Sequence, residues 1–200
     1  AISRYRQALE IQPAFAEVQL TLANLLRAIG RLDEAVVGYR RVLELQPDFV
    51  ELHGNLGNVL NELGLFSDAA ASYRQVLLLR PDDAIAHNNL GNVLKELDCA
   101  AESLASYRRA VEIDPEFSVA HFNIGLAMQR LHDNEQALAS YKTAAEIDPE
   151  YAEAQLNMGF LLRELAQLDD AESCCRKALT IRPDYAEAHL CLGNIQQDRG

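Results

Sequence analysis

The sequence predicts an all-α protein, a right-handed superhelical solenoid of antiparallel helix pairs, and three observations carry this prediction. The first is a strict period, because every proline follows the previous one by 34 residues. A fixed repeat of this length is typical of solenoids, in which each unit packs mainly on its neighbours. The prolines are Pro13, Pro47, Pro81, Pro115, Pro149 and Pro183.

The second observation is that small and aromatic residues recur with the same period. A glycine inside a helix costs roughly 1 kcal/mol relative to alanine, so glycines recurring at one position predict the close approach of a partner helix. The tyrosine column is interrupted once, by Cys175. The small residues are Ala23, Gly57, Gly91, Gly125, Gly159 and Gly193, and the tyrosines are Tyr5, Tyr39, Tyr73, Tyr107 and Tyr141.

The third observation is helical spacing within each unit. Ala35, Tyr39 and Val42 follow the i, i+4, i+7 pattern of one helix face. Each unit therefore contains two helices, which we place at about 50–63 and 67–80 in the second full unit.

The residues between these stripes indicate where the helices begin and end. Gly30 and Gly64 stand where a first helix should stop, because glycine accepts the left-handed conformation of a C-terminal cap. Asp33, Ser67 and Asp169 are expected to cap the second helix. Each proline then separates one unit from the next.

The period makes the whole chain, residues 1–200, a single array. Its five full repeats are expected at 16–49, 50–83, 84–117, 118–151 and 152–185. Residues 1–15 correspond to a second helix alone, and residues 186–200 to a first helix alone. The chain is therefore expected to be an excerpt of a longer solenoid. Because helix 186–200 would leave Ala186, Leu190 and Ile195 uncovered, we predict homo-association through the terminal helices.

These columns resemble the tetratricopeptide repeat (TPR) family, and the resemblance covers essentially the whole chain. It implies a concave groove lined by the first helix of each repeat, which binds an extended peptide of a partner protein. The expected function is thus a protein–protein interaction scaffold. Two alternatives remain open: the substrate-recognition arm of a larger enzyme, such as a protein glycosyltransferase, and a self-assembling scaffold.

Two asparagine columns are the candidate peptide-binding residues. The resemblance places both in the groove, where an amide can donate to and accept from a peptide backbone. Hydrogen bonding within the scaffold is the alternative role. The first column is Asn55, Asn89, Asn123 and Asn157, and the second contains Asn24, Asn58 and Asn92. The first column also resembles the asparagine ladder in the TPR arm of protein O-linked N-acetylglucosamine transferases.

Basic residues in the same groove suggest a weaker alternative, a clamp for a terminal carboxylate. Arg27, Lys95 and Arg163 are expected in the groove. They are interleaved with glutamates, and Glu51 and Ile85 occupy positions where such a clamp needs cations. We therefore include these three cations in the peptide-binding set without assigning a clamp.

Composition excludes several other functions. A formal net charge of −12 offers no basic track for nucleic acid or for an anionic membrane. No apolar run approaches the ~20 residues of a membrane-spanning helix. Four cysteines without the regular spacing of a disulfide scaffold favour a reducing, cytoplasmic compartment.

No pattern predicts a cofactor, a metal or catalysis. His53, His87, His121 and His189 share one column, but residues one repeat apart are too widely separated to ligate one ion, so we expect them to pack between helices. Cys174 and Cys175 point about 100° apart on one helix and are interpreted as buried thiols. No nucleophile has an identifiable base, and the chain is predicted not to be an enzyme.

Overall fold

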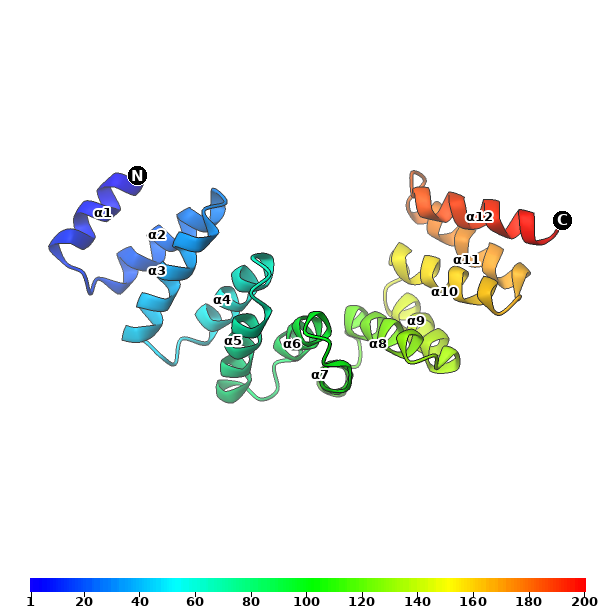
Figure 1. Cartoon of the computed structure of the whole chain (residues 1–200), viewed down its shortest axis with the longest axis horizontal. Coiled ribbons are helices and arrows are strands. Elements are labelled where there is room, and N and C mark those ends of the chain that lie inside the picture. Colours follow the sequence, from blue (N-terminus) through cyan, green and yellow to red (C-terminus); the bar gives the residue numbers. More distant parts are fainter. The chain divides into compact units, whose positions relative to one another are not determined.

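The computed structural model describes residues 1–200 and confirms the all-α solenoid of the TPR type (Figure 1). Short turns join twelve helices, and there is no strand. The helices are α1 (Ile2–Ile11), α2 (Ala16–Ala28), α3 (Leu32–Leu45), α4 (Val50–Glu62), α5 (Phe66–Leu79), α6 (Ala84–Glu96), α7 (Ala100–Ile113), α8 (Ser118–Arg130), α9 (Asn134–Ile147), α10 (Ala152–Glu164), α11 (Leu168–Ile181) and α12 (Ala186–Asp198). The division into five full and two half repeats stays a prediction.

The helices form two compact units, Ala1–Ser106 and Tyr107–Gly200. In the first unit, α2 packs on α3 and α4 on α5, and successive pairs meet where α1 contacts α2, α3 contacts α4 and α5 contacts α6. In the second unit, α8 packs on α9 and α10 on α11, and α12 lies against both α10 and α11. No helix is both long enough and apolar enough to span a bilayer.

One left-handed residue closes each turn from a first helix to a second. Gly30 and Gly64 adopt φ values of 77° and 72°, as expected for glycine caps. Asp98, His132 and Ala166 adopt nearly the same conformation, with φ between 58° and 59°. In the turn after α4, the Gly64 and Leu65 amides donate to the carbonyls of Asn61 and Leu60, at 3.0 and 2.8 Å. Because three residues other than glycine adopt this left-handed conformation, the backbone of these turns does not require glycine.

The predicted side-chain caps of the second helices were wrong by two residues. The residues that precede α3, α5 and α11 are Arg31, Leu65 and Gln167, and none of them caps its helix through a side chain. Asp33, Ser67 and Asp169 instead lie within the first turn. There the two aspartates face the positive end of the helix dipole. Side-chain caps form instead at α6 and α9. Asp83 caps α6 and Asp133 caps α9, because their carboxylates accept from the Ala86 and Gln136 amides.

Close packing of small residues against tyrosine forms the core. Tyr39 and Tyr141 are fully buried, and a Cβ added at Gly125 would lie 2.5 Å from the Tyr141 ring. A Cβ at Gly57 would likewise lie 2.7 Å from the Tyr73 ring. Glycine at positions 57 and 125 is therefore explained by the aromatic rings that pack on it.

Exposed ion pairs join successive second helices of the first unit. Arg6 pairs with Glu34 at 2.7 Å, and the same pair recurs one repeat later between Arg40 and Asp68 at 2.6 Å. A third, longer pair joins Arg74 to Glu102 at 3.4 Å. Exposed pairs of this kind contribute about 0–1 kcal/mol each, so they orient neighbouring helices more than they stabilise them.

Helix α12 is less exposed than the sequence suggested. Ile195 was expected to lack cover, but it is fully buried, because Ala188, Cys191 and Ile195 form the inward stripe of α12. Leu190 lies off this stripe and is 61% exposed. Homo-association through this end stays a prediction.

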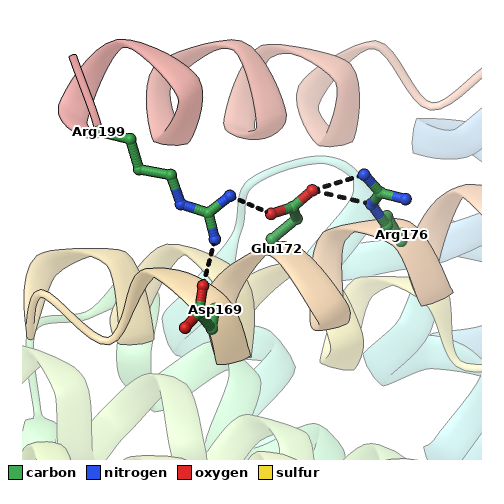
Figure 2. A network of polar contacts seen from close by, with 4 residues as sticks. All are labelled: Asp169, Glu172, Arg176 and Arg199. Carbon is green, nitrogen blue, oxygen red and sulfur yellow. Dashed lines mark hydrogen bonds and ion pairs between the residues drawn. The ribbon is translucent and has the colours of Figure 1, made fainter.

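A network of charges fastens the end of α12 to the start of α11 (Figure 2). The Arg199 guanidinium lies between Asp169 and Glu172 and bonds to both carboxylates. Arg176, one turn further along α11, donates to the other oxygen of Glu172. The hydrogen bonds from Arg176 and then Arg199 lower the pKa of Glu172 below its ordinary value of 4.5.

The lowered pKa of Glu172 predicts that the contribution of Arg199 to stability depends on pH. Because the folded pKa lies below the unfolded one, this contribution is complete above about pH 4.5 and is lost as the pH falls through the folded pKa. Thermal unfolding followed by circular dichroism should give the native protein a higher melting temperature than Arg199→Ala at neutral pH. The difference between the two melting temperatures should shrink as the pH is lowered. A gap that stays constant down to acid would contradict this role for the network.

Candidate functional site

The first unit contains a hollow of about 380 Å³ between α4, α5 and α6. Three asparagines line it, Asn55 and Asn58 from α4 and Asn89 from α6. Its apolar lining includes Val50, Val76 and Ile85, and its charged residues are Glu51, Arg80 and Asp83. Amides, aliphatic groups and charges of both signs are thus available within one concave surface.

Helical spacing brings the asparagines to this surface. Asn55 and Asn58 are three residues apart on α4, so they share one face of the helix. Asn89 occupies on α6 the repeat position that Asn55 occupies on α4. The side chain at Ile85 is 64% exposed, four residues before Asn89 and on the same face of α6. The structure therefore brings three of the predicted site residues together and adds an exposed aliphatic neighbour.

Residues of the second asparagine column are fixed by buried tyrosines. Tyr73 donates from Oη to Asn58 Oδ1 at 2.7 Å, and Tyr39 donates to Asn24 Oδ1 at 2.8 Å. Burial raises the pKa of Tyr73 to about 12, so its hydroxyl keeps its proton at neutral pH. These two asparagines therefore have a structural contact through Oδ1, while Nδ2 still has two protons to donate.

In the second unit, the corresponding tyrosine uses a different acceptor. Leu126 occupies the repeat position that Asn58 occupies two repeats earlier, so no amide is available there. Tyr141 donates instead to Gln129 Oε1, at 2.9 Å. Gln129 lies one turn further along α8. The tyrosine hydroxyl is therefore satisfied in both units although the asparagine is not always present.

The remaining asparagines of the predicted site differ in their surroundings. Asn157 donates from Nδ2 to the Glu153 carbonyl of its own helix at 2.8 Å, so part of its capacity is used within α10. Asn123 on α8 and Asn92 on α6 are half-buried. The amide of Asn89 is approached by Asn88 Nδ2 at 3.5 Å, which is too long to be a strong bond.

Two of the three predicted cations are engaged by carboxylates. Arg163 binds Asp198 of α12 through two nitrogens, at 2.6 and 3.3 Å. Lys95 Nζ lies 3.2 Å from Glu96 Oε1. Arg27 is exposed in the last turn of α2. A terminal carboxylate would have to compete with Asp198 or Glu96 at two of these positions.

An ion pair at the hollow was missed from the sequence. Arg80, just after α5, donates to Glu51 at the start of α4. The same pair recurs three repeats later, where Arg182 donates to Glu153 at 2.6 Å. Burial raises the pKa of Glu153, but the hydrogen bond and charge of Arg182, together with a backbone hydrogen bond, outweigh burial, so the net shift of the pKa is downward. The signal was available, because both repeats place Glu four residues after a proline and Arg just before the next one.

Each histidine of the column also makes a backbone contact at the turn between repeats, which the expectation of packing between helices did not include. In each case Nε2 lies 2.7–3.0 Å from the carbonyl oxygen of the proline six residues earlier. A carbonyl can only accept, so Nε2 carries the proton in each ring. Among the residues described, no three His, Cys, Asp or Glu side chains gather as a metal site.

Comparisons with known proteins place the chain among repeat proteins. A model of the TPR repeat matches residues 23–64, 57–98 and 133–166, and a model of the tetratricopeptide repeat matches residues 84–117 and 152–185. Together these matches cover well over half of the chain. No curated protein sequence matches it.

Several solved structures share the fold. YrrB, described as a TPR protein with an unusual peptide-binding site, is 25% identical over 95% of this chain and 98% of its own, with a TM-score of 0.71. MamA of Desulfovibrio magneticus RS-1 is 20% identical over 86% and 97%, with a TM-score of 0.77. The pilF product of Pseudomonas aeruginosa is 22% identical over 92% and 85%, also with a TM-score of 0.77. At these identities, the likeness establishes the fold.

Proposed function

Because the chain belongs to the tetratricopeptide repeat family, we propose that it is a protein-interaction module that binds an extended peptide segment of a partner in the hollow between α4, α5 and α6. The single observation that carries this proposal is the convergence of Asn55, Asn58 and Asn89 on one concave surface. Peptide capture of this kind is the binding step that an adaptor and the recognition arm of a larger enzyme both require.

The asparagines would bind the peptide backbone. The Asn55 and Asn89 amides each offer donors and an acceptor, which match the carbonyl and N–H groups of an extended chain, while Asn58, whose Oδ1 accepts from Tyr73, offers its Nδ2 protons. Neighbouring helices lie about 8–10 Å apart, and an extended chain rises about 3.3 Å per residue. Asn55 and Asn89 would therefore contact the peptide about three residues apart, whatever side chains it carries.

The apolar lining would select one side chain of the peptide. Val50, Val76 and Ile85 provide aliphatic surface beside the asparagines. A peptide that places Leu, Ile or Val here removes apolar surface from water, at about 25 cal/mol per Å². A bulky aliphatic residue is therefore the expected anchor.

Charge would favour a basic peptide. The hollow contains the carboxylates of Glu51 and Asp83 and only one cation, Arg80, which is already paired with Glu51. The chain as a whole carries a formal charge of −12. Complementary charges accelerate encounter and disfavour partners of the same sign, so lysine or arginine is expected beside the anchor.

The test uses peptides selected from a random phage-displayed library, with affinity then measured by calorimetry. Replacing both Asn55 and Asn89 by alanine should weaken binding by roughly tenfold or more, because each hydrogen bond contributes about 1 kcal/mol. Asn134→Ala, at the start of α9, is the matched control and should bind normally. Circular dichroism should show equal helicity in all three proteins.

A second variant blocks the hollow without disturbing the helix. Gly54 lines the hollow, and a Cβ added there would meet only Val76, at an ordinary 3.9 Å. Gly54→Leu should therefore fold at least as well as the native chain, since leucine favours helix, and should abolish binding of the selected peptides. Selected peptides that bind both Gly54→Leu and the double asparagine variant with native affinity would overturn the proposal.

A further inference from the structure

Two departures from the repeat pattern meet in the second unit. Cys175 on α11 stands in the tyrosine column, and Cys191 on α12 stands where the four middle repeats have asparagine. Their sulfur atoms lie 2.6 Å apart, and both residues are fully buried. Elsewhere the first column contains tyrosine and the second contains asparagine or Thr21, and none of these side chains can form a disulfide with its neighbour.

The surrounding helices hold this pair in place. The Cys175 sulfur packs directly on Gly159 of α10, because a Cβ added at Gly159 would lie 2.5 Å from this sulfur. Cys191 belongs to the inward stripe of α12, with Ala188 and Ile195. A covalent S–S bond is about 2.05 Å long, so the sulfurs need to approach by only about half an ångström. Cys174 points about 100° away around α11 and is not aimed at Cys191.

We infer that Cys175 and Cys191 form a disulfide that links α11 to α12, made by exchange with a low-molecular-weight disulfide such as oxidised glutathione. One cysteine thiolate attacks a sulfur of the reagent and releases the first glutathione thiolate. The second cysteine then displaces the second glutathione from the mixed disulfide. Two cysteine thiols are oxidised, one glutathione disulfide is reduced to two thiols, and the two cysteine protons end on the released glutathiones.

Burial makes this a slow, structural linkage. Burial raises the pKa of both thiols, so few thiolates are present at neutral pH. The reagent therefore reaches the sulfurs when α12 opens transiently from α11. The Arg199 network lies at the same seam, with α12 on one side and Asp169 and Glu172 of α11 on the other (Figure 2). Release of Arg199 would accompany this opening.

Intact-protein mass spectrometry after incubation with oxidised glutathione tests the linkage. The expected product has lost the mass of two hydrogen atoms, and two of its four thiols remain titratable in denaturant. Peptide mapping should join the segments that contain Cys175 and Cys191. Amide exchange in α12 should slow by roughly tenfold to a hundredfold, because a closed loop of this length restricts the unfolded chain.

Matched variants assign the bond. Cys99→Ala and Cys174→Ala should still lose two hydrogens, whereas Cys191→Ala should not. Because Cys191→Ala leaves only a small buried cavity, circular dichroism is expected to show native helicity. Four free thiols after prolonged oxidation, glutathione adducts without an internal bond, or a bond between Cys174 and Cys175 would each overturn the inference. None of these outcomes bears on peptide binding in the first unit.

Discussion

Gly125→Ala should destabilise the protein, although alanine is the better helix former. The new Cβ would lie 2.5 Å from two atoms of the Tyr141 ring. That ring cannot easily move, because it is fully buried, packs against Phe122 at 5.5 Å and donates to Gln129. Overpacking costs about 1–3 kcal/mol, against roughly 1 kcal/mol gained in helix propensity. A net loss of up to about 2 kcal/mol in the free energy of unfolding is expected from urea unfolding.

Gly193→Ala is the control, since it makes the same substitution at the same repeat position. A Cβ at Gly193 would have no neighbour within 4 Å. Only the propensity effect remains, so this variant should be more stable by up to about 1 kcal/mol. The two variants should therefore change the free energy of unfolding in opposite directions. If Gly125→Ala also stabilised the protein, close contact with the tyrosine ring could not be the reason for glycine at this position.

Leu60→Ala should cause a large and local loss of stability. Leu60 is 1% exposed and belongs to the core of the first unit. Truncating a buried leucine costs about 2–5 kcal/mol, because apolar burial is lost and a cavity remains. In a repeat array each element is stabilised mainly by its neighbours. Hydrogen exchange should therefore accelerate in α4 and α5 while α11 and α12 keep their native rates.

Leu78→Ala removes the same atoms from the exposed face of α5. Its side chain is 71% exposed, so the variant should stay within about 0.5 kcal/mol of the native protein. Equal urea midpoints for the two leucine variants would show that the core does not depend on Leu60. Uniform acceleration of exchange in α4, α5, α11 and α12 would instead show that the array unfolds as one cooperative body.

The helices were predictable because their signals repeat. One proline, one small residue and one tyrosine per period were enough to place α4 and α5 within one residue of their observed ends. The caps were less predictable, since Asp33 and Ser67 have the right chemistry but lie two residues inside their helices. Electrostatic attraction to a helix N-terminus extends over its first turn, so an acidic residue there does not mark one position.

The contacts of the site residues were only partly predictable. That Asn55, Asn58 and Asn89 share a surface follows from helical spacing and the period. That Tyr73 engages Asn58, or that Arg163 engages Asp198, does not follow, because these pairs join different helices and depend on how the helices pack. The hydrogen bond from each histidine to a proline carbonyl was also missed. Its acceptor is a backbone oxygen, which every residue has, so no residue type in the sequence indicates it.

The left-handed turns also bear on how such a chain can be rearranged. Glycine, aspartate, histidine and alanine all adopt the same backbone there, so the conformation is imposed by the helices on either side. A crossover between two repeats at this turn would join segments that already have matching geometry. The turns therefore have equivalent backbone geometry. Repeats duplicated, deleted or exchanged at these turns would keep the same backbone conformation.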